Sequence, residues 1–350
     1  YSWEIHQREK VSSKDVVDLK AWTMDEVFAN AQKACDEVWQ IRDQLGNQSV
    51  SVLSEFINEN TYPKEIRKTL RDAVSYLRVE LLADTTGWRP DHSNEVYRLD
   101  LMGLLSSADK PDGAALRNVS LSDPAVHPLT RIAAALDDLE QWHVVAGRTE
   151  AALEARLTRL SHLWGSFTEA EDRIAIRKDL EGRLPAVKGK AWWAMGMATL
   201  AEFVRGEDTP DAQVRALALA EECAGAPSPG GLRCQRIAQE IRAPDFGLQA
   251  MSTDAPGKRS IGVEHRNLQA LHFRAYAMDL LQLIASSDEY RFYPSGRALD
   301  ALVASRKPTL VWKVDLPATP DYRMHRTFVT PPIQKSGFYV VVASARENFG

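Results

Sequence analysis

Apolar residues along the first two thirds of the chain recur at steps of three and four positions, the period of an amphipathic helix. One such stripe runs through Val27, Ala31, Ala34, Val38 and Ile41. Similar stripes follow at 70–81, 132–142, 153–164 and 193–204. The pattern predicts helices in series up to about residue 245.

Turn-forming residues separate these stripes. Pro63 is expected in the first turn of a helix, where a proline is tolerated. The stretch 105–129 is rich in Ser, Asp, Gly and Pro, which predicts the longest loop of the chain. Asp123 or Thr130 is expected to cap the helix that follows this loop.

The stripe at 193–204 belongs to a helix predicted at about 190–205, and two further helices are predicted at about 211–224 and 231–242. Their size, their small alanines and the closing Pro/Ser turn resemble a tetratricopeptide-like unit, without a strict 34-residue period. We therefore predict an irregular helical-repeat domain over residues 1–245. Of the adjacent Trp192 and Trp193, one is expected in the core, because neighbouring helical positions point about 100° apart.

The period changes at about residue 245. Strand-like segments are expected at 260–265, 270–278, 309–316, 323–330 and 337–343, with a short helix at 295–305. Alternation of apolar and polar residues is clear at 271–276, where His272 is expected on the opposite face from Leu271 and Phe273. Short strands within about 100 residues predict a β-sandwich over residues 246–350.

Composition and charge narrow the classes of partner. The 350 residues are 44% apolar and 26% charged, as in a folded globular protein. The net charge of −5 gives no electrostatic reason to expect nucleic acid or an anionic membrane as a partner. No apolar stretch approaches the roughly 20 residues of a membrane span. The chain begins at Tyr1 without a leader and ends directly after a strand-like segment, so we expect a fragment of a longer protein.

Three cysteines are too few for a disulfide framework and lack metal-ligand spacing. Cys223 and Cys234 flank the loop 224–231, and a short loop between two helices can bring them within bridging distance. A disulfide and two buried thiols are both compatible with this pattern. Cys35 is expected to be a packed apolar side chain.

No pattern of catalytic or metal-binding residues is present. None of the eight histidines stands at ligand spacing from another histidine or a cysteine. His143 and His162 fall on helical stripes and are expected to be structural, while Asp137, Asp138 and Glu140 are interpreted as a solvated helix face. A Gly-x-Ser-x-Gly motif, a phosphate-binding loop and a dinucleotide fingerprint are absent. We predict no catalytic residue, no cofactor, no metal and no enzymatic activity.

Several segments of the last third resemble the first macroglobulin domain of large bacterial alpha-2-macroglobulins. The segment PGKRSIGVEHRNLQALHFRAYAMDL carries the Arg266-Asn267 pair ahead of a strand with a Φ-x-x-R-x-Y core, Leu271 to Tyr276. The segment PTLVWKVDLPATPDYRMHRTFVTPPIQKSGFYVVVAS has the remaining motifs in the family's order, and its Trp312 resembles the buried tryptophan of that sandwich. Upstream, GLRCQRIAQEIRAP, DDLEQWH and LTRLSHLW are similar to the family's helical region. The resemblance covers about residues 130–350.

The resemblance implies capture of proteases in the periplasm or at the cell surface. In this family a bait segment is cleaved and the molecule closes around the protease, and many members carry an internal thioester. Cys35, Cys223 and Cys234 all lack the Cys-x-Glu-Gln run that the thioester needs. Any bait and thioester are therefore expected outside this segment, which would be a non-catalytic, N-terminal scaffold.

Two other functions remain open. The first is a helical-repeat adaptor whose concave face binds a partner protein of the cell envelope. The second is a helical enzyme joined to a β domain, such as a polysaccharide lyase, which the architecture alone allows.

Overall fold

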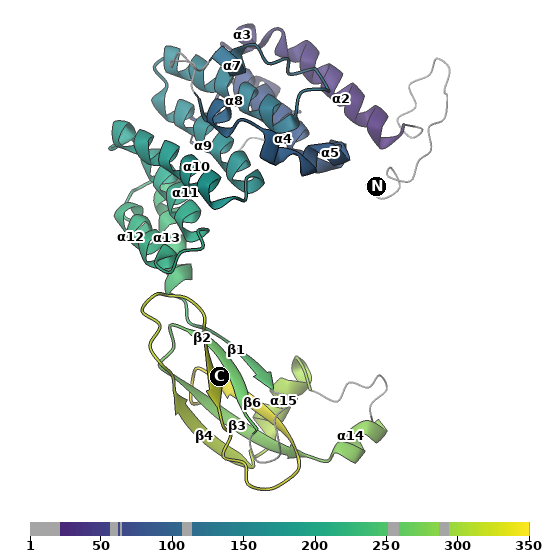
Figure 1. The fold of residues 1–350 in the computed structure, drawn as a ribbon, viewed down its shortest axis with the longest axis vertical. Coiled ribbons are helices and arrows are strands. Elements are labelled where there is room, and N and C mark those ends of the chain that lie inside the picture. Colours follow the sequence, from purple (N-terminus) through teal and green to yellow (C-terminus); the bar gives the residue numbers. More distant parts are fainter. Residues whose placement is uncertain are drawn as a thin grey trace. The chain divides into compact units, whose positions relative to one another are not determined.

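The computed structural model describes residues 22–56, 62–63, 65–106, 114–250, 259–286 and 294–349. These residues divide into two compact units, one up to Ala238 and one from Gln239 onward. The first is built from helices and the second mainly from antiparallel strands, in the order that the sequence predicts (Figure 1). The boundary precedes residue 245, because the carbonyls of Ile241 and Ala243 accept hydrogen bonds from Asn267 in the second unit.

Two of the earlier helices begin at a capping box, in which two N–H groups at the helix start are bonded reciprocally. Thr23 and Glu26 form the first box, and Thr69 and Asp72 form the second. The helical segments of this region are α2 (Met24–Trp39), α3 (Arg42–Leu45), η1 (Val50–Leu53), α4 (Leu70–Ala83), η2 (Thr85–Gly87), α5 (Pro90–Asn94), η3 (Val96–Arg98), α6 (Leu101–Leu105) and α7 (Ala114–Arg117).

Longer helices follow one another in the rest of the first unit (Figure 1). They are α8 (Pro128–Val145), α9 (Thr149–Ser166), α10 (Ala170–Arg183), η5 (Leu184–Val187), α11 (Trp193–Arg205), α12 (Ala212–Cys223) and α13 (Pro229–Arg242). Helix α8 packs against both α4 and α9, and α11 packs against both α9 and α12. None of the described helices is long and apolar enough to cross a membrane.

Apolar residues of three helices form a hydrophobic core around α8. Val79 of α4, Ile132 and Leu136 of α8 and Ala155 of α9 are each at most 1% exposed. Because α8 has neighbours on two sides, small alanines at 133–135 are also buried along it. The apolar stripe predicted at 132–142 marks this core correctly.

The stripe predicted for α4 is wrong, because its Leu77 is 50% exposed and Tyr76, Val79 and Leu82 form the core instead. The stripe predicted through Val38 and Ile41 is not buried either.

Helix α13 is held by a disulfide and by a close approach of backbones. Cys223 at the end of α12 is bonded to Cys234 of α13, with their Cα atoms 5.9 Å apart. Gly230, in the first turn of α13, lies so close to α11 that a Cβ there would stand 2.2 Å from the backbone nitrogen of Met195. The bridge and the glycine together fix the first turns of α13 beside α11.

Three local predictions differ from the structure. The helix expected at Pro63 begins instead at Leu70, where the Thr69 capping box is available. Helix α8 is capped by His127, whose Nδ1 accepts a hydrogen bond from the Leu129 N–H at 3.1 Å. Asp123 accepts a hydrogen bond from the Ala125 N–H within its own turn instead. Within the predicted loop 105–129, the structure places the short helix α7.

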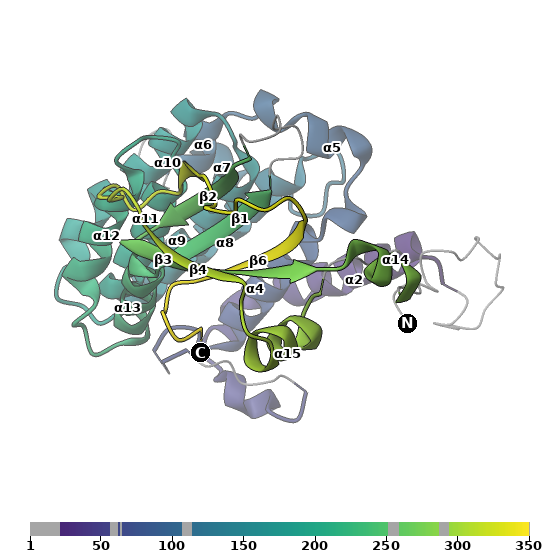
Figure 2. The ribbon, with the colours of Figure 1, turned by 90° about the horizontal axis from the view of Figure 1, so that it is seen from below.

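The second unit contains two three-stranded antiparallel sheets, with strand orders β1-β2-β5 and β4-β3-β6 (Figure 2). The strands are β1 (Asp245–Ala250), β2 (Ile261–Arg266), β3 (Ala270–Met278), β4 (Leu310–Asp315), β5 (His325–Val329) and β6 (Phe338–Ser344). Helices α14 (Leu280–Ser286) and α15 (Arg297–Ser305) lie between β3 and β4 in the chain. Five strands and α15 fall where the sequence predicts them, whereas β1 and α14 are additional.

The two sheets share one hydrophobic core. Val263 of β2 and Leu271 and Phe273 of β3 are completely buried in it, and His272 faces the other side of β3 as expected. The Trp312 ring stacks on Phe273 with ring centroids 5.0 Å apart. Trp312 is only half-buried, contrary to the expectation of a buried residue, because β4 is an edge strand and even its core-facing residues are only half-buried.

A turn between β2 and β3 joins distant parts of the second unit. Asn267 has a φ of +53°, a left-handed conformation that asparagine tolerates better than most residues. Its backbone N–H donates to the Thr319 hydroxyl at 2.8 Å, and its side-chain amide donates to the carbonyl of Ile241 at 2.8 Å. The Arg-Asn pair therefore has a structural role at the start of β3.

Candidate functional site

The acidic residues interpreted as a solvated face of α8 are mostly buried. Asp137 is 3% exposed and Glu140 is 5% exposed, although Asp138 stays half-buried. They face two arginines of α9 that are themselves at most 1% exposed, Arg156 and Arg159. The interpretation is wrong because α8 lies between α4 and α9 and has no fully solvated face.

These side chains form a cluster of ion pairs, to which Asp179 and Arg183 of α10 add longer contacts. Glu140 contacts Arg156 at 3.0 Å and Arg159 at 2.7 Å, and Arg159 also contacts Asp137 at 3.0 Å. Burial, together with the neighbouring Arg159, lowers the pKa of Arg156 to about 10, so its side chain remains charged near neutral pH. Arg156 also donates to the Leu105 carbonyl at the end of α6. The cluster therefore ties α6, α8 and α9 together.

Several histidines contact residues that are distant in the sequence. The His143 Nε2 lies 2.7 Å from a carboxylate oxygen of Asp72, and both side chains are buried. His92 and His127 have ring centroids 5.2 Å apart, and the His127 Nε2 lies 2.8 Å from the His92 carbonyl oxygen. His265 and His325 are paired in register across β2 and β5.

No metal centre is formed within the described ranges. There, no three His, Cys, Asp or Glu side chains come together in a group that could hold a metal ion. Burial lowers the pKa of both His92 and His127, which favours neutral rings in hydrogen bonds to the protein. His6 lies outside the described residues.

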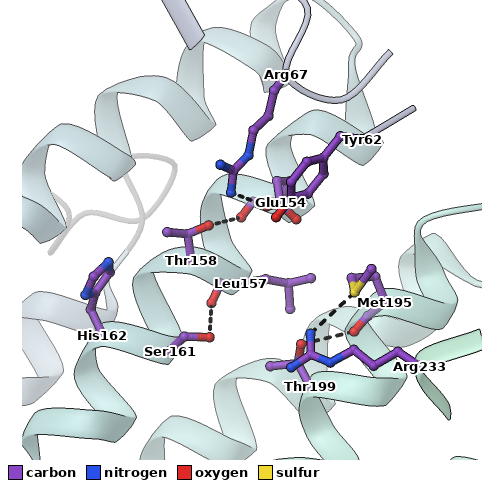
Figure 3. A pocket seen from close by; sticks show the side chains of 10 residues that line it. All are labelled: Tyr62, Arg67, Glu154, Leu157, Thr158, Ser161, His162, Met195, Thr199 and Arg233. Atoms are coloured by element: carbon purple, nitrogen blue, oxygen red, sulfur yellow. Dashed lines mark hydrogen bonds and ion pairs between the residues drawn. The ribbon is translucent and has the colours of Figure 1, made fainter. Parts of the chain in front are cut away.

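One face of α9 forms the wall of a cavity of about 330 Å³, which we name the α9 pocket (Figure 3). Its lining residues come from the segment before α4 and from helices α9, α11 and α13. They are Tyr62, Arg67, Glu154, Leu157, Thr158, Ser161, His162, Met195, Thr199 and Arg233. The five residues of α9 recur at steps of three, one, three and one, so they share one helical face.

Glu154 organises the upper part of the α9 pocket. Its carboxylate accepts hydrogen bonds from Arg67 at 2.6 Å and from the Trp192 indole N–H at 2.8 Å. Tyr62 also hydrogen-bonds to this carboxylate, and burial and the Glu154 charge raise the pKa of its phenol. The Arg67 guanidinium lies over the rings of Tyr62 and Tyr76, which orients it toward Glu154.

Arg233 forms the opposite rim. Its Nε lies 3.1 Å from Glu202 of α11, and its Nη2 contacts the other oxygen of the same carboxylate. Its Nη1 contacts the Met195 sulfur at 3.4 Å. The disulfide at the next residue, Cys234, and the close approach of Gly230 place this arginine beside α11.

Three hydroxyl groups line the remaining wall, and each donates to a carbonyl of its own helix. Thr158 donates to Glu154 at 3.0 Å, Ser161 to Leu157 at 2.8 Å, and Thr199 to Met195 at 3.1 Å. A hydroxyl has one hydrogen and two acceptor sites, so these three side chains present acceptors to the cavity.

His162 completes the wall of the α9 pocket. Its half-buried ring has no hydrogen-bond partner among the described residues. Burial lowers the pKa of this ring, so the neutral form is favoured. The pocket therefore combines donors and acceptors around an apolar patch formed by Leu157 and Met195.

The sequence pattern does not predict this site. The helical stripe at 153–164 marks the buried face of α9, whereas the pocket lies on a face with Glu154, Thr158 and Ser161, a pattern that also fits a solvated surface. Arg67 and Arg233 are 166 positions apart, so only the fold brings them together. His162 is expected to be structural, and the structure places its half-buried ring at the wall of the cavity.

Comparison with known proteins adds no relative. No protein-family model, curated protein or solved structure matches the chain.

Proposed function

We propose that the chain is a non-catalytic, N-terminal scaffold of a bacterial alpha-2-macroglobulin-like protease trap in the periplasm or at the cell surface. The supporting observation is that motifs far apart in the sequence meet in the second unit. Asn267 of the Arg-Asn pair binds Thr319, which lies just ahead of Asp321 to His325, the Asp-Tyr-x-x-His motif of the resemblance. Phe273 of the Φ-x-x-R-x-Y strand stacks on Trp312. Motifs that cooperate in one core are expected of one domain type.

We propose further that the second unit is a macroglobulin-type sandwich and that the first is an irregular, tetratricopeptide-like array. Two antiparallel sheets around one core are the arrangement that a macroglobulin-type sandwich requires, and helices in series are what a tetratricopeptide-like array requires. In the proposed trap, the helical unit and the sandwich support a bait and any thioester located elsewhere in the full-length protein. Proteases are then the partners of the whole trap.

A substrate-size assay on the full-length protein containing this chain tests the proposal. A protease enclosed by a trap keeps its active site, so it should still cleave a small chromogenic peptide but lose activity on a large protein such as azocasein. The chain of residues 1–350 alone should leave both activities unchanged. Loss of both activities, or of neither, with serine, cysteine and metalloproteases would contradict the proposal.

The α9 pocket favours a second candidate function, an adaptor that binds a partner protein of the cell envelope. Trap and adaptor roles are separable, because the trap needs elements outside this chain and the adaptor does not. Affinity capture from envelope extract with the full chain, followed by mass spectrometry, should then retain a defined partner. Capture of no partner above a control resin would contradict the adaptor function.

A further inference from the structure

We propose that the α9 pocket binds an uncharged, extended peptide segment of a partner protein. The inference goes beyond the trap function, does not depend on it, and rests on the adaptor candidate, to which it gives a chemical class of ligand. It is argued from the charge balance, the hydrogen-bonding groups and the apolar surface of the pocket.

The charges of the pocket are already balanced. Arg67 is paired with Glu154 at 2.6 Å, and Arg233 is paired with Glu202. A charged ligand group would lose hydration in this half-enclosed site. The pocket offers it no unpaired charge of opposite sign in return. The balance therefore disfavours both a cationic and an anionic ligand.

The hydrogen-bonding groups are of both kinds. Thr158, Ser161 and Thr199 offer acceptors because their hydrogens are bonded to helix carbonyls. A guanidinium has five N–H groups, and Arg233 uses Nε and Nη2 on Glu202 and Nη1 on a weak sulfur acceptor. Donors therefore remain for a ligand carbonyl. A peptide group supplies one N–H and one carbonyl, which matches this set.

Apolar surface lies between the polar groups. The Leu157 side chain lies between Glu154 and Arg233 and points toward Met195 (Figure 3). A methionine adapts its shape to different apolar side chains, and alternate residues of an extended peptide project toward the same face. The volume of about 330 Å³ is near the lower end of ligand pockets, so a short stretch of peptide fits it.

A saccharide is the alternative neutral ligand with donors and acceptors. Sugar rings are typically held against an open aromatic face, and the aromatic residue of this pocket is Tyr62. The Tyr62 ring is already covered by Arg67 at 4.3 Å and neighboured by Trp192, with ring centroids 5.5 Å apart. The peptide is therefore favoured.

The test uses the full chain and N-acetylated, C-amidated tetrapeptides composed of uncharged residues. Saturation-transfer NMR selects the tightest-binding peptide, and calorimetry gives its Kd. Thr158→Val removes an acceptor from the pocket without changing the shape of the side chain, and Arg233→Met removes donors. Each is expected to raise the Kd at least about tenfold, a change of about 1.4 kcal/mol. Thr149→Val is the matched control, because its hydroxyl is exposed on α9 outside the pocket, and its Kd should not change.

Several results would overturn the inference. These are no binding of capped peptides up to millimolar concentration, tighter binding of maltotetraose or chitotetraose, and tighter binding of the same peptide carrying Asp or Lys. Equal affinity for wild type and both pocket variants would place the peptide elsewhere. In that case a partner captured from envelope extract would still support the adaptor function, so the two failures are distinguishable. Unfolding curves of each variant exclude loss of fold as the cause.

Discussion

Helix α9 carries charged groups on two faces, and the two faces differ in what surrounds them. On one face, Arg156 and Arg159 are at most 1% exposed and meet carboxylates of α8. On the other, Glu154 pairs with Arg67 beside a cavity of about 330 Å³. The first arrangement buries both partners of each ion pair, whereas the second borders a cavity lined by hydroxyl groups and Arg233.

The difference separates a structural role from a binding role. A buried charge needs a partner to offset lost hydration, so the cluster of α8 and α9 specifies how these helices pack. The charged residues of the α9 pocket are also paired. However, its hydroxyl groups and Arg233 keep hydrogen-bonding sites that the described residues do not fill. Variants of the first face should therefore change stability, and variants of the second face should change binding.

The largest effect is expected when the cluster of ion pairs between α8 and α9 is broken. Glu140→Ala removes the carboxylate shared by Arg156 and Arg159 and leaves both guanidinium groups buried with too few partners. Unfolding by urea should show a loss of about 3–5 kcal/mol. Glu181→Gln is the control, because its pair with Arg177 is partly exposed and should contribute less than about 1 kcal/mol. Equal losses for the two variants would contradict a structural cluster.

Removal of the disulfide tests how much the bridge stabilises α13 beside the α9 pocket. The double substitution Cys223→Ala and Cys234→Ala opens a loop with a sequence separation of 11 residues. The free energy of unfolding should fall by about 2–3 kcal/mol, measured against wild type without reductant. Because Arg233 precedes Cys234, peptide affinity should fall as well. Unchanged stability would show that the packing of α13 does not need the bridge.

Gly230→Ala tests the close approach of α13 and α11. The added Cβ would stand 2.2 Å from the Met195 nitrogen, so the two helices must move apart at the pocket rim. Overpacking of this kind costs about 1–3 kcal/mol, measurable by thermal unfolding. Gly225→Ala is the matched control, since no atom lies within 4 Å of a Cβ there. A larger loss for Gly225→Ala would refute this account of α13.

The smallest expected effect is on the pH dependence of stability. Burial lowers the pKa of His92 and His127, so the unfolded chain binds more protons than the folded chain below the ordinary histidine pKa of about 6.5. Stability from these groups is present above that pH and is lost as the pH falls toward the lowered folded pKa. His127→Asn keeps a capping side chain for α8 and should flatten the stability loss between pH 7.5 and 5. An unchanged profile would exclude His127 as a contributor.

The sequence predicts the helices and most strands because their apolar residues repeat with a fixed period. Helices α11, α12 and α13 lie within three residues of the predicted bounds, and the stripe of Ile132 and Leu136 lies in the core. Strand β1 is missed although Phe246, Leu248 and Ala250 alternate with less apolar residues, because this segment falls at the expected boundary between the two domains.

The candidate site could not be predicted from the sequence. The spacing of Asp137 and Glu140 fits a solvated helix face as well as a buried one. Only the position of Arg159 in space shows which of the two faces it is. Likewise, Arg67 and Arg233 enter one pocket through long-range packing. The spacing of apolar residues along a helix carries no information about which distant side chains come together.

The most direct test of the two-faced helix measures stability and peptide affinity on the same two variants. Arg159→Met should lower the free energy of unfolding by about 3 kcal/mol or more, with the peptide Kd of the folded protein unchanged. Arg233→Met, whose ion pair is partly exposed, should cost less than about 1 kcal/mol and raise the Kd at least about tenfold. The opposite result, a large stability loss for Arg233→Met with unchanged peptide affinity, would contradict the division of roles between the two faces of α9.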